Sequence, residues 1–159
     1  MRLSEYMTTH IWNHLSIRLT SFQPLQNEAV NSRRCGMTAR TPTGDLVSAP
    51  PLRKLDPLDD LGGGGLYSAP SDYIKLLAAL LKNDGMLLKP ESVSEMFTPQ
   101  LPTDKYLAVA LSDETAGPML KSGVSDSNAW NWGLGGILNM EDVEGITNKG
   151  TMTWGKLLF

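Results

Sequence analysis

The sequence predicts an α+β fold, because helical patterns come first along the chain and strand patterns follow. Apolar residues recur at helical spacing in the first two thirds of the chain, and two strand candidates, 131–140 and 151–156, lie near its end. The chain has 159 residues, of which 41% are hydrophobic and 19% are charged. It can therefore bury a core of ordinary size.

Apolar residues at helical spacing predict an amphipathic helix over 4–14, for which Ser4 is the expected N-cap. Five prolines interrupt 20–61. Only short strands are expected there, around 36–39 and 46–48, with a tight turn between them. The rest of this segment is expected to be irregular.

The clearest helix follows Ser68, which is the expected N-cap, and it carries Pro70 and Asp72 in its first turn. Gly85 suits the left-handed position after the helix. The apolar residues of the helix are expected to face inward, and they are Tyr73, Leu76, Leu77, Leu80 and Leu81.

Two further helices are expected at 90–97 and 105–111, and the first of them begins at Pro90 and stops before Pro99. The segment 113–128 is polar and is expected to form a loop.

The formal net charge of −3 gives no electrostatic footprint for nucleic acid and no polybasic patch for a membrane, so neither partner is expected. The longest apolar run, 74–81, is far shorter than the roughly 20 residues of a membrane span. The first residues hold no apolar signal segment. Cys35 is the one cysteine, which excludes an internal disulfide, and it is expected to be a small buried residue. These features predict a soluble, cytoplasmic protein.

No metal site and no cofactor are predicted. His10 and His14 stand one helical turn apart, but Ile11 occupies the position where a zinc-peptidase helix carries glutamate, so both are expected to be exposed or half-buried helix residues. The four glycines at 62–65 lack the G-K-[ST] ending of a P-loop and the strand context of a dinucleotide site. Their backbone is expected to pack closely against a sheet.

A serine nucleophile needs a base that can take its proton. The sequence contains neither the G-x-S-x-G pattern nor a serine followed by lysine at S-x-x-K spacing. Thr153 and Lys156 imitate that spacing, but a strand would place their side chains on opposite faces. The carboxylates of Glu141, Asp142 and Glu144 follow a polar turn and are expected to be solvated.

The glycine run and the helix after it resemble the β-lactamase-related family, on the stretch GGGGLYSAPSDY at 62–73 and its continuation through 76–88. This family includes class C β-lactamases, penicillin-binding-protein-like esterases and fungal acyltransferases. Three further stretches are most similar to the lovastatin-type polyketide acyltransferases of fungal secondary metabolism, and they are 5–12, 90–97 and 132–142. The resemblance implies an incomplete β-lactamase/transpeptidase-like fold, with mostly helices and loops and a remnant of the antiparallel sheet.

In this family, the serine and lysine of S-x-x-K and the tyrosine of a Y-x-N-like motif form the acyl-transfer centre. The resemblance places both motifs before the helix at 4–14. Residues 1–159 are therefore expected to be a partial domain without the nucleophile region and without the last strands and helix. No catalytic residue is predicted within the chain.

A third family motif, Trp-Gly-Gly in many esterase-like members, lies on the strand at the edge of the pocket. Trp154 and Gly155 match its first two residues, and Lys156 replaces the second glycine. The resemblance implies that the next residue, Leu157, gives a backbone N–H to the oxyanion hole. Trp154, Gly155 and Leu157 are thus the predicted substrate-binding residues.

Two functions remain open. The chain can be part of a serine acyltransferase or esterase that acts on a small-molecule ester, thioester or lactam, and it would then be inactive alone. It can also be a non-catalytic small-molecule-binding or interaction module, in which the glycines at 62–65, Trp130, Trp132 and Trp154 line an apolar groove. Core packing is the alternative role for each tryptophan. An unpaired strand edge at 151–156 also predicts self-association.

Overall fold

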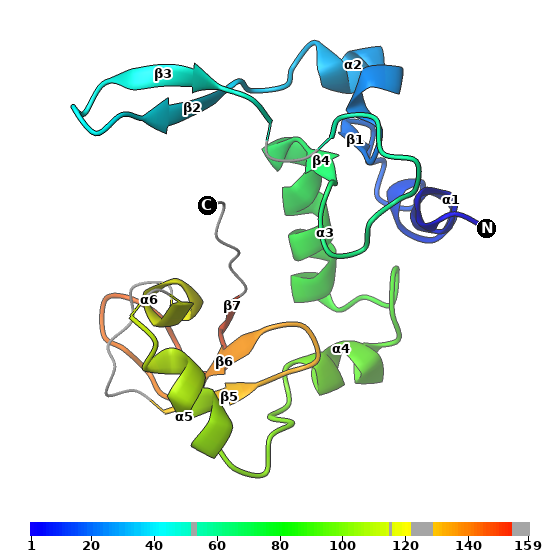
Figure 1. Ribbon diagram of the computed structural model, residues 1–159. Coiled ribbons are helices and arrows are strands. Elements are labelled where there is room, and N and C mark those ends of the chain that lie inside the picture. Colours follow the sequence, from blue (N-terminus) through cyan, green and yellow to red (C-terminus); the bar gives the residue numbers. More distant parts are fainter. Residues whose placement is uncertain (52–53, 115, 122–128, 154–159) are drawn as a thin grey trace. The chain divides into compact units, whose positions relative to one another are not determined.

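The computed structural model describes residues 1–51, 54–114, 116–121 and 129–153, and it divides the chain into two compact units, Met1–Leu87 and Leu88–Phe159. The described residues form helices and three small antiparallel sheets, which confirms the α+β class (Figure 1). The units are described in turn.

The first unit begins with a helical segment in which α1 (Leu3–Met7) continues into a π-helical turn, η1 (Thr8–Trp12). The predicted helix at 4–14 is confirmed, but Ser4 is not its cap. Arg2 is the N-cap, and its backbone N–H donates to the Glu5 carboxylate at 2.9 Å. The Ser4 N–H instead donates to Asp60 Oδ2 at 2.7 Å, which ties this helix to a distant loop.

Short elements follow the first helix: β1 (Thr20–Ser21), η2 (Pro24–Gln26) and α2 (Glu28–Asn31). The predicted strands are confirmed as β2 (Met37–Arg40) and β3 (Leu46–Ala49), which form an antiparallel hairpin. Cys35, just before this hairpin, is exposed, so the expectation of a buried residue is wrong. The sequence carried no signal for this, because no element of regular structure covers that position.

The long helix of the first unit is α3 (Pro70–Lys82), and Ala69 is its N-cap, so the prediction of Ser68 as the cap is wrong. Ser68 belongs to β4 (Tyr67–Ser68), which pairs antiparallel with β1. At the other end Asn83 is the C-cap with a left-handed φ of 49°, and Gly85, two residues on, has the left-handed φ of 81° that was expected of it. Asparagine tolerates this conformation because its short side chain can bond locally.

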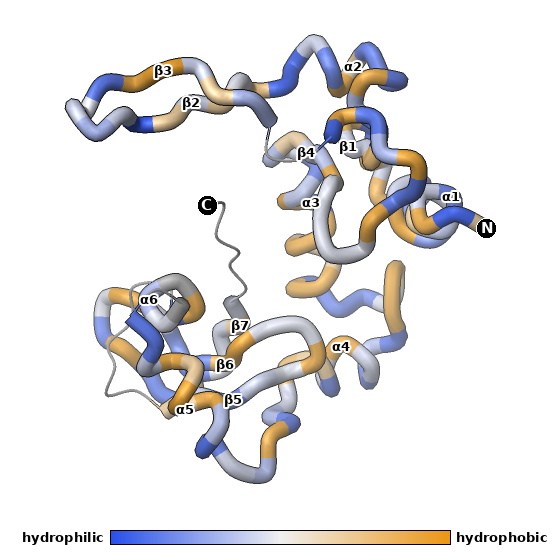
Figure 2. The backbone as a smooth tube through the Cα atoms, viewed as in Figure 1, coloured by the Kyte–Doolittle hydropathy of each residue, from blue (hydrophilic) through white to orange (hydrophobic). Residues whose placement is uncertain are grey.

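The inward face predicted for α3 is only partly buried. Leu76 and Leu80 are half-buried, as predicted. Tyr73 and Leu81 are 56% and 80% exposed, and Leu77 is exposed as well. Figure 2 shows the apolar colour that these turns of the helix carry.

Asp72, in the first turn of α3, is the buried residue of the helix and holds it against the chain before β1. Its Oδ2 accepts hydrogen bonds from the backbone N–H groups of Arg18 at 2.9 Å and Leu19 at 2.5 Å. Its Oδ1 pairs with Lys75 Nζ at 2.9 Å, and the same ammonium donates to the Ser16 carbonyl at 2.6 Å. A buried charge is stable only when it is paired in this way.

The second unit begins with α4 (Pro90–Met96) and α5 (Lys105–Leu111), both as predicted, and Val93 is buried on α4. A short helix, α6 (Ala116–Leu120), lies where a loop was expected. The polar composition of this segment suggested a loop, but Pro118 stands in the first turn of the helix, where proline is tolerated.

A three-stranded antiparallel sheet in the order β5-β6-β7 follows: β5 (Trp130–Trp132), β6 (Ile137–Asn139) and β7 (Met152–Thr153). The segment 131–140 was expected to be one strand, and this is wrong. The chain reverses between Trp132 and Ile137, where the Gly133 N–H donates to the Gly136 carbonyl at 2.8 Å. β6 pairs with β7, so the two segments that were predicted to contain strands lie side by side.

The core of the second unit is a cluster of four buried residues, and these are Leu107, Leu111, Trp130 and Ile137. It joins α5 to the first two strands of the sheet. None of the described helices is long and apolar enough to cross a membrane.

Candidate functional site

The predicted site strand is described only up to Thr153. Trp154, Gly155 and Leu157 lie outside the described residues, as does Lys156. The structure does describe β7, which directly precedes these residues. It pairs with β6 in the register Leu138↔Met152 and Ile137↔Thr153.

The strand β6, against which β7 is held, is the most deeply buried part of the second unit. Ile137 and Leu138 are almost wholly inaccessible to solvent. The Asn139 N–H donates to the Thr151 carbonyl at 3.0 Å, and the Asn139 carbonyl accepts from Gly150 N–H at 2.7 Å. Asn139 is itself buried and fixes the entry into β7. The sequence reasoning did not single out Asn139, and a polar residue in an apolar strand was the signal.

Two glycines allow the backbone to pack closely around this strand. A Cβ at Gly133 would overlap the carbonyl oxygen of Met96, and one at Gly136 would stand 2.5 Å from the carbonyl oxygen of Thr153. Their positional roles were not predicted, although glycine near a strand commonly marks a close backbone approach.

The backbone of the glycine run at 62–65 was expected to pack closely against a sheet, and this is wrong for Gly62, Gly63 and Gly65. A Cβ at Gly62 would meet only Leu3 Cδ2, at 3.8 Å, and Gly63 and Gly65 have open space. Gly65 has a φ of 86°, so its conformation rather than crowding favours glycine. Gly64 and Gly65 line a hollow of about 520 Å³ with Phe22 in the first unit.

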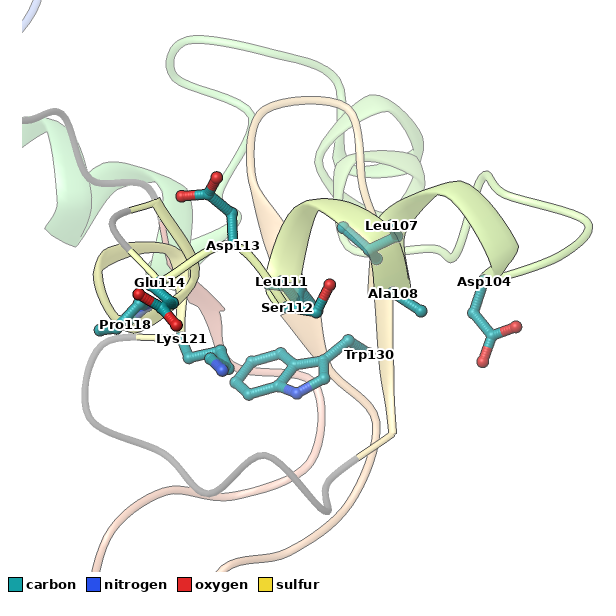
Figure 3. Close-up of a pocket in the computed structure, with 10 residues that line it drawn as sticks. All are labelled: Asp104, Leu107, Ala108, Leu111, Ser112, Asp113, Glu114, Pro118, Lys121 and Trp130. Carbon is teal, nitrogen blue, oxygen red and sulfur yellow. The ribbon is translucent and has the colours of Figure 1, made fainter.

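A cavity of about 480 Å³ lies over α5, α6 and β5 in the second unit (Figure 3). Leu107, Ala108 and Leu111 of α5 form its apolar side. Figure 3 shows the Trp130 indole beneath these residues, with Lys121 near one end of the ring. Three acidic side chains also line the cavity, and these are Asp104, Asp113 and Glu114.

Trp130 belongs to the core, which is one of the two roles considered for it, and it also lines this cavity. It is 8% exposed, and among the described residues its indole Nε1 has no hydrogen-bond partner. A buried donor left without an acceptor costs about 1–3 kcal/mol. Trp132 is half-buried and packs against the core cluster.

The remaining polar candidates lie at the surface. His10 and His14 are exposed, as predicted, and the described residues hold no group of three side chains that could bind a metal ion. Glu141, Asp142 and Glu144 are also exposed, as predicted.

Two displaced pKa values in the first unit have structural causes. Burial would raise the pKa of Asp72, but hydrogen bonds from Lys75 and from backbone N–H groups outweigh it and lower the pKa below 3.8. The pKa of Asp60 is also lowered. Burial would raise it, but the hydrogen bonds from Ser4 and the positive charge of Arg2 outweigh the effect of burial. Both carboxylates serve backbone groups and are not arranged as an acid–base pair.

No family model matches the sequence. The chain is 35% identical to the lovastatin esterase of Penicillium rubens, over 96% of this chain and 39% of that protein. It is also 35% identical to the acyltransferase calJ of Penicillium decumbens, over 96% of this chain and 37% of that protein.

Solved structures show similarity to the same kind of fungal protein. A LovD6 mutant of the simvastatin synthase LovD from Aspergillus terreus matches 98% of this chain and 40% of its own, with a TM-score of 0.81 and 32% identity. A penicillin-binding protein homologue from Pyrococcus abyssi, 19% identical, shares the fold with a TM-score of 0.55. The chain spans a little under two fifths of the length of these curated relatives. It is a partial homologue of the fungal lovastatin esterases and LovD-type acyltransferases, which are β-lactamase-related proteins.

Proposed function

We propose that the chain is part of a serine acyltransferase or esterase and supplies the strand at the edge of its acyl-transfer pocket. The observation that carries this proposal is the match of nearly the whole chain, 96% to 98% of it, to the fungal lovastatin esterase and the LovD structure. The substrate of the intact protein would be a small-molecule ester, thioester or lactam.

The contribution of this strand is electrostatic. The Leu157 N–H would stabilise the oxyanion that develops during acyl transfer, and a donor of this kind contributes about 2.7–4 kcal/mol to transition-state stabilisation. Such a donor must be held in place before the reaction. The pairing of β7 with the buried strand β6, closed by Gly136 and Asn139, supports this role.

The chain has no esterase activity of its own in this proposal, because its sequence has no S-x-x-K serine and no Y-x-N-like tyrosine. The test is hydrolysis of p-nitrophenyl butanoate, followed by absorbance with a serine esterase as positive control. We expect neither a burst nor turnover. Turnover that a serine-directed fluorophosphonate abolishes would contradict the proposal.

The cavity over α5 favours a second candidate, a non-catalytic small-molecule-binding module. Its apolar side and the unpartnered Trp130 N–H suit a ligand that offers a hydrogen-bond acceptor. A neutral ester that raises the melting temperature of the wild type but not of Ala108→Phe, which fills the cavity, would favour this function. Equal shifts in both proteins would count against it.

A further inference from the structure

We propose that a second cavity, enclosed by α2, β4 and the start of α3 in the first unit, binds the anionic head group of a small amphipathic molecule. The cavity has a volume of about 440 Å³. Arg33 and Arg34 supply its charge, and the head group is a carboxylate or a phosphate. The site uses none of the residues of the acyl-transfer strand, so it does not depend on the proposed function.

The two arginines make this cavity positive. Both line it, and none of the described residues that line it carries a carboxylate. Among the described residues, neither guanidinium takes part in an ion pair or a side-chain hydrogen bond. Glu28, on α2, does not line the cavity either. Within the described part of a protein whose net charge is −3, two arginines thus line one cavity without an ion-pair partner.

Arginine suits this task because its planar guanidinium binds carboxylate and phosphate oxygens in a bidentate way and remains charged at any ordinary pH. Tyr67 and Ser71 also line the cavity, and each carries a hydroxyl group. Ser71 stands in the first turn of α3, where backbone N–H groups carry partial positive charge that favours an anion.

The apolar part of the cavity accounts for the body of the ligand. Leu19 and Val30 line it, and Val30 is 6% exposed, so a hydrocarbon chain would contact an existing core. The volume falls within the range of small-molecule sites. The cavity over α5, in contrast, is lined by three acidic side chains and would repel the same anion.

The sequence alone did not indicate this site, because two adjacent arginines are too few to form a basic patch. The fold creates the site when it brings α2 next to β4 and α3, which are distant from it in sequence (Figure 1).

Cys35 gives a direct measure of occupancy, because it lines the cavity, is exposed and is the one cysteine of the chain. The experiment follows alkylation of Cys35 by N-ethylmaleimide with intact-protein mass spectrometry. The probes are hexanoate, hexyl phosphate and the neutral ester methyl hexanoate. We expect saturable protection by at least one of the two anions, and the better one identifies the head group. Methyl hexanoate should give none.

The matched variants separate the cavity from general charge. Arg33→Gln with Arg34→Gln should weaken protection at least about tenfold, because each lost charge-assisted hydrogen bond changes affinity by about this factor. Arg40→Gln removes the same charge from β2, where the side chain bonds the Gly44 carbonyl, and should leave protection unchanged. Calorimetric titration of hexanoate and hexyl phosphate into the wild type and the double arginine variant detects binding that does not shield the thiol.

Three results would overturn the proposal. The first is that neither anion gives protection or binding heat up to its solubility limit. The second is equal protection by methyl hexanoate. The third is equal affinity in the wild type and in the double arginine variant.

Discussion

The backbone carbonyl oxygen of Thr153 lies 2.5 Å from the point where a Cβ at Gly136 would stand. Real Cβ atoms do not approach a carbonyl oxygen so closely, so β7 can hold its place beside β6 only while residue 136 is glycine. The strand that leads to Trp154 and Gly155 is therefore positioned by a residue on its neighbour.

Gly136→Ala should lower the free energy of unfolding by about 1–3 kcal/mol, the usual cost of an overpacked interior. Gly135→Ala is the control, because its Cβ would meet its nearest atoms, Met96 Cε and Met152 Sδ, at ordinary contact distances of 3.7 and 3.8 Å. Urea unfolding followed by circular dichroism measures both. Equal effects of the two substitutions would show that the contact with Thr153 has no special role.

Asp72→Ala should lower the free energy of unfolding by about 2–3 kcal/mol, because two backbone N–H groups and Lys75 lose a charged acceptor. Asp59→Ala is the matched control, since that side chain is 86% exposed and its contact with Arg2 is 3.9 Å long. The control should stay within about 0.5 kcal/mol of the wild type. If Asp72→Ala had the same free energy of unfolding as the wild type, this carboxylate would not anchor α3.

The contribution of Asp72 should depend on pH in a defined direction. Its pKa is lowered in the folded protein, so the stabilisation is fully present above the unfolded value of 3.8 and is lost as the pH falls through the folded pKa. The stability difference between the wild type and Asp72→Ala should thus be constant near neutral pH and shrink below pH 3.8. A difference that grew on acidification would reverse the assigned direction.

The free edge of β7 should promote self-association, because β7 pairs with β6 on one side and the described residues provide no strand on the other. Thr151→Lys places a charge on an exposed side chain beside this edge and should reduce association. Size-exclusion chromatography with light scattering, over a range of protein concentrations, measures this. A wild type that stays monomeric at every concentration would contradict the prediction.

Elements with a strong local pattern could be predicted from the sequence. The helix α5 and the hairpin of β2 and β3 follow from apolar spacing and turn residues, and both were found where expected. The errors arose where distant segments decide the outcome. Ser68 is not a helix cap because it pairs with Thr20 and is therefore part of a strand. Ser4 is not a helix cap either, and its backbone N–H donates to the distant Asp60.

The candidate site could be predicted less well than the fold. Trp154 and Gly155 were predicted as site residues from their match to a family motif, and they lie outside the described residues. The residues that position this strand, Gly136 and Asn139, became visible only when the neighbouring backbone was in place. Likewise, Trp130 could be judged as core or cavity lining only from its burial, and it proved to be both.

The central claim is that this chain supplies a wall of an acyl-transfer pocket and no nucleophile. It is tested most directly by intact-protein mass spectrometry after incubation with p-nitrophenyl butanoate and an acid quench. We predict no butanoyl adduct beyond that of a heat-denatured control. A stoichiometric butanoyl adduct on a serine, blocked by prior treatment with a fluorophosphonate, would contradict the claim.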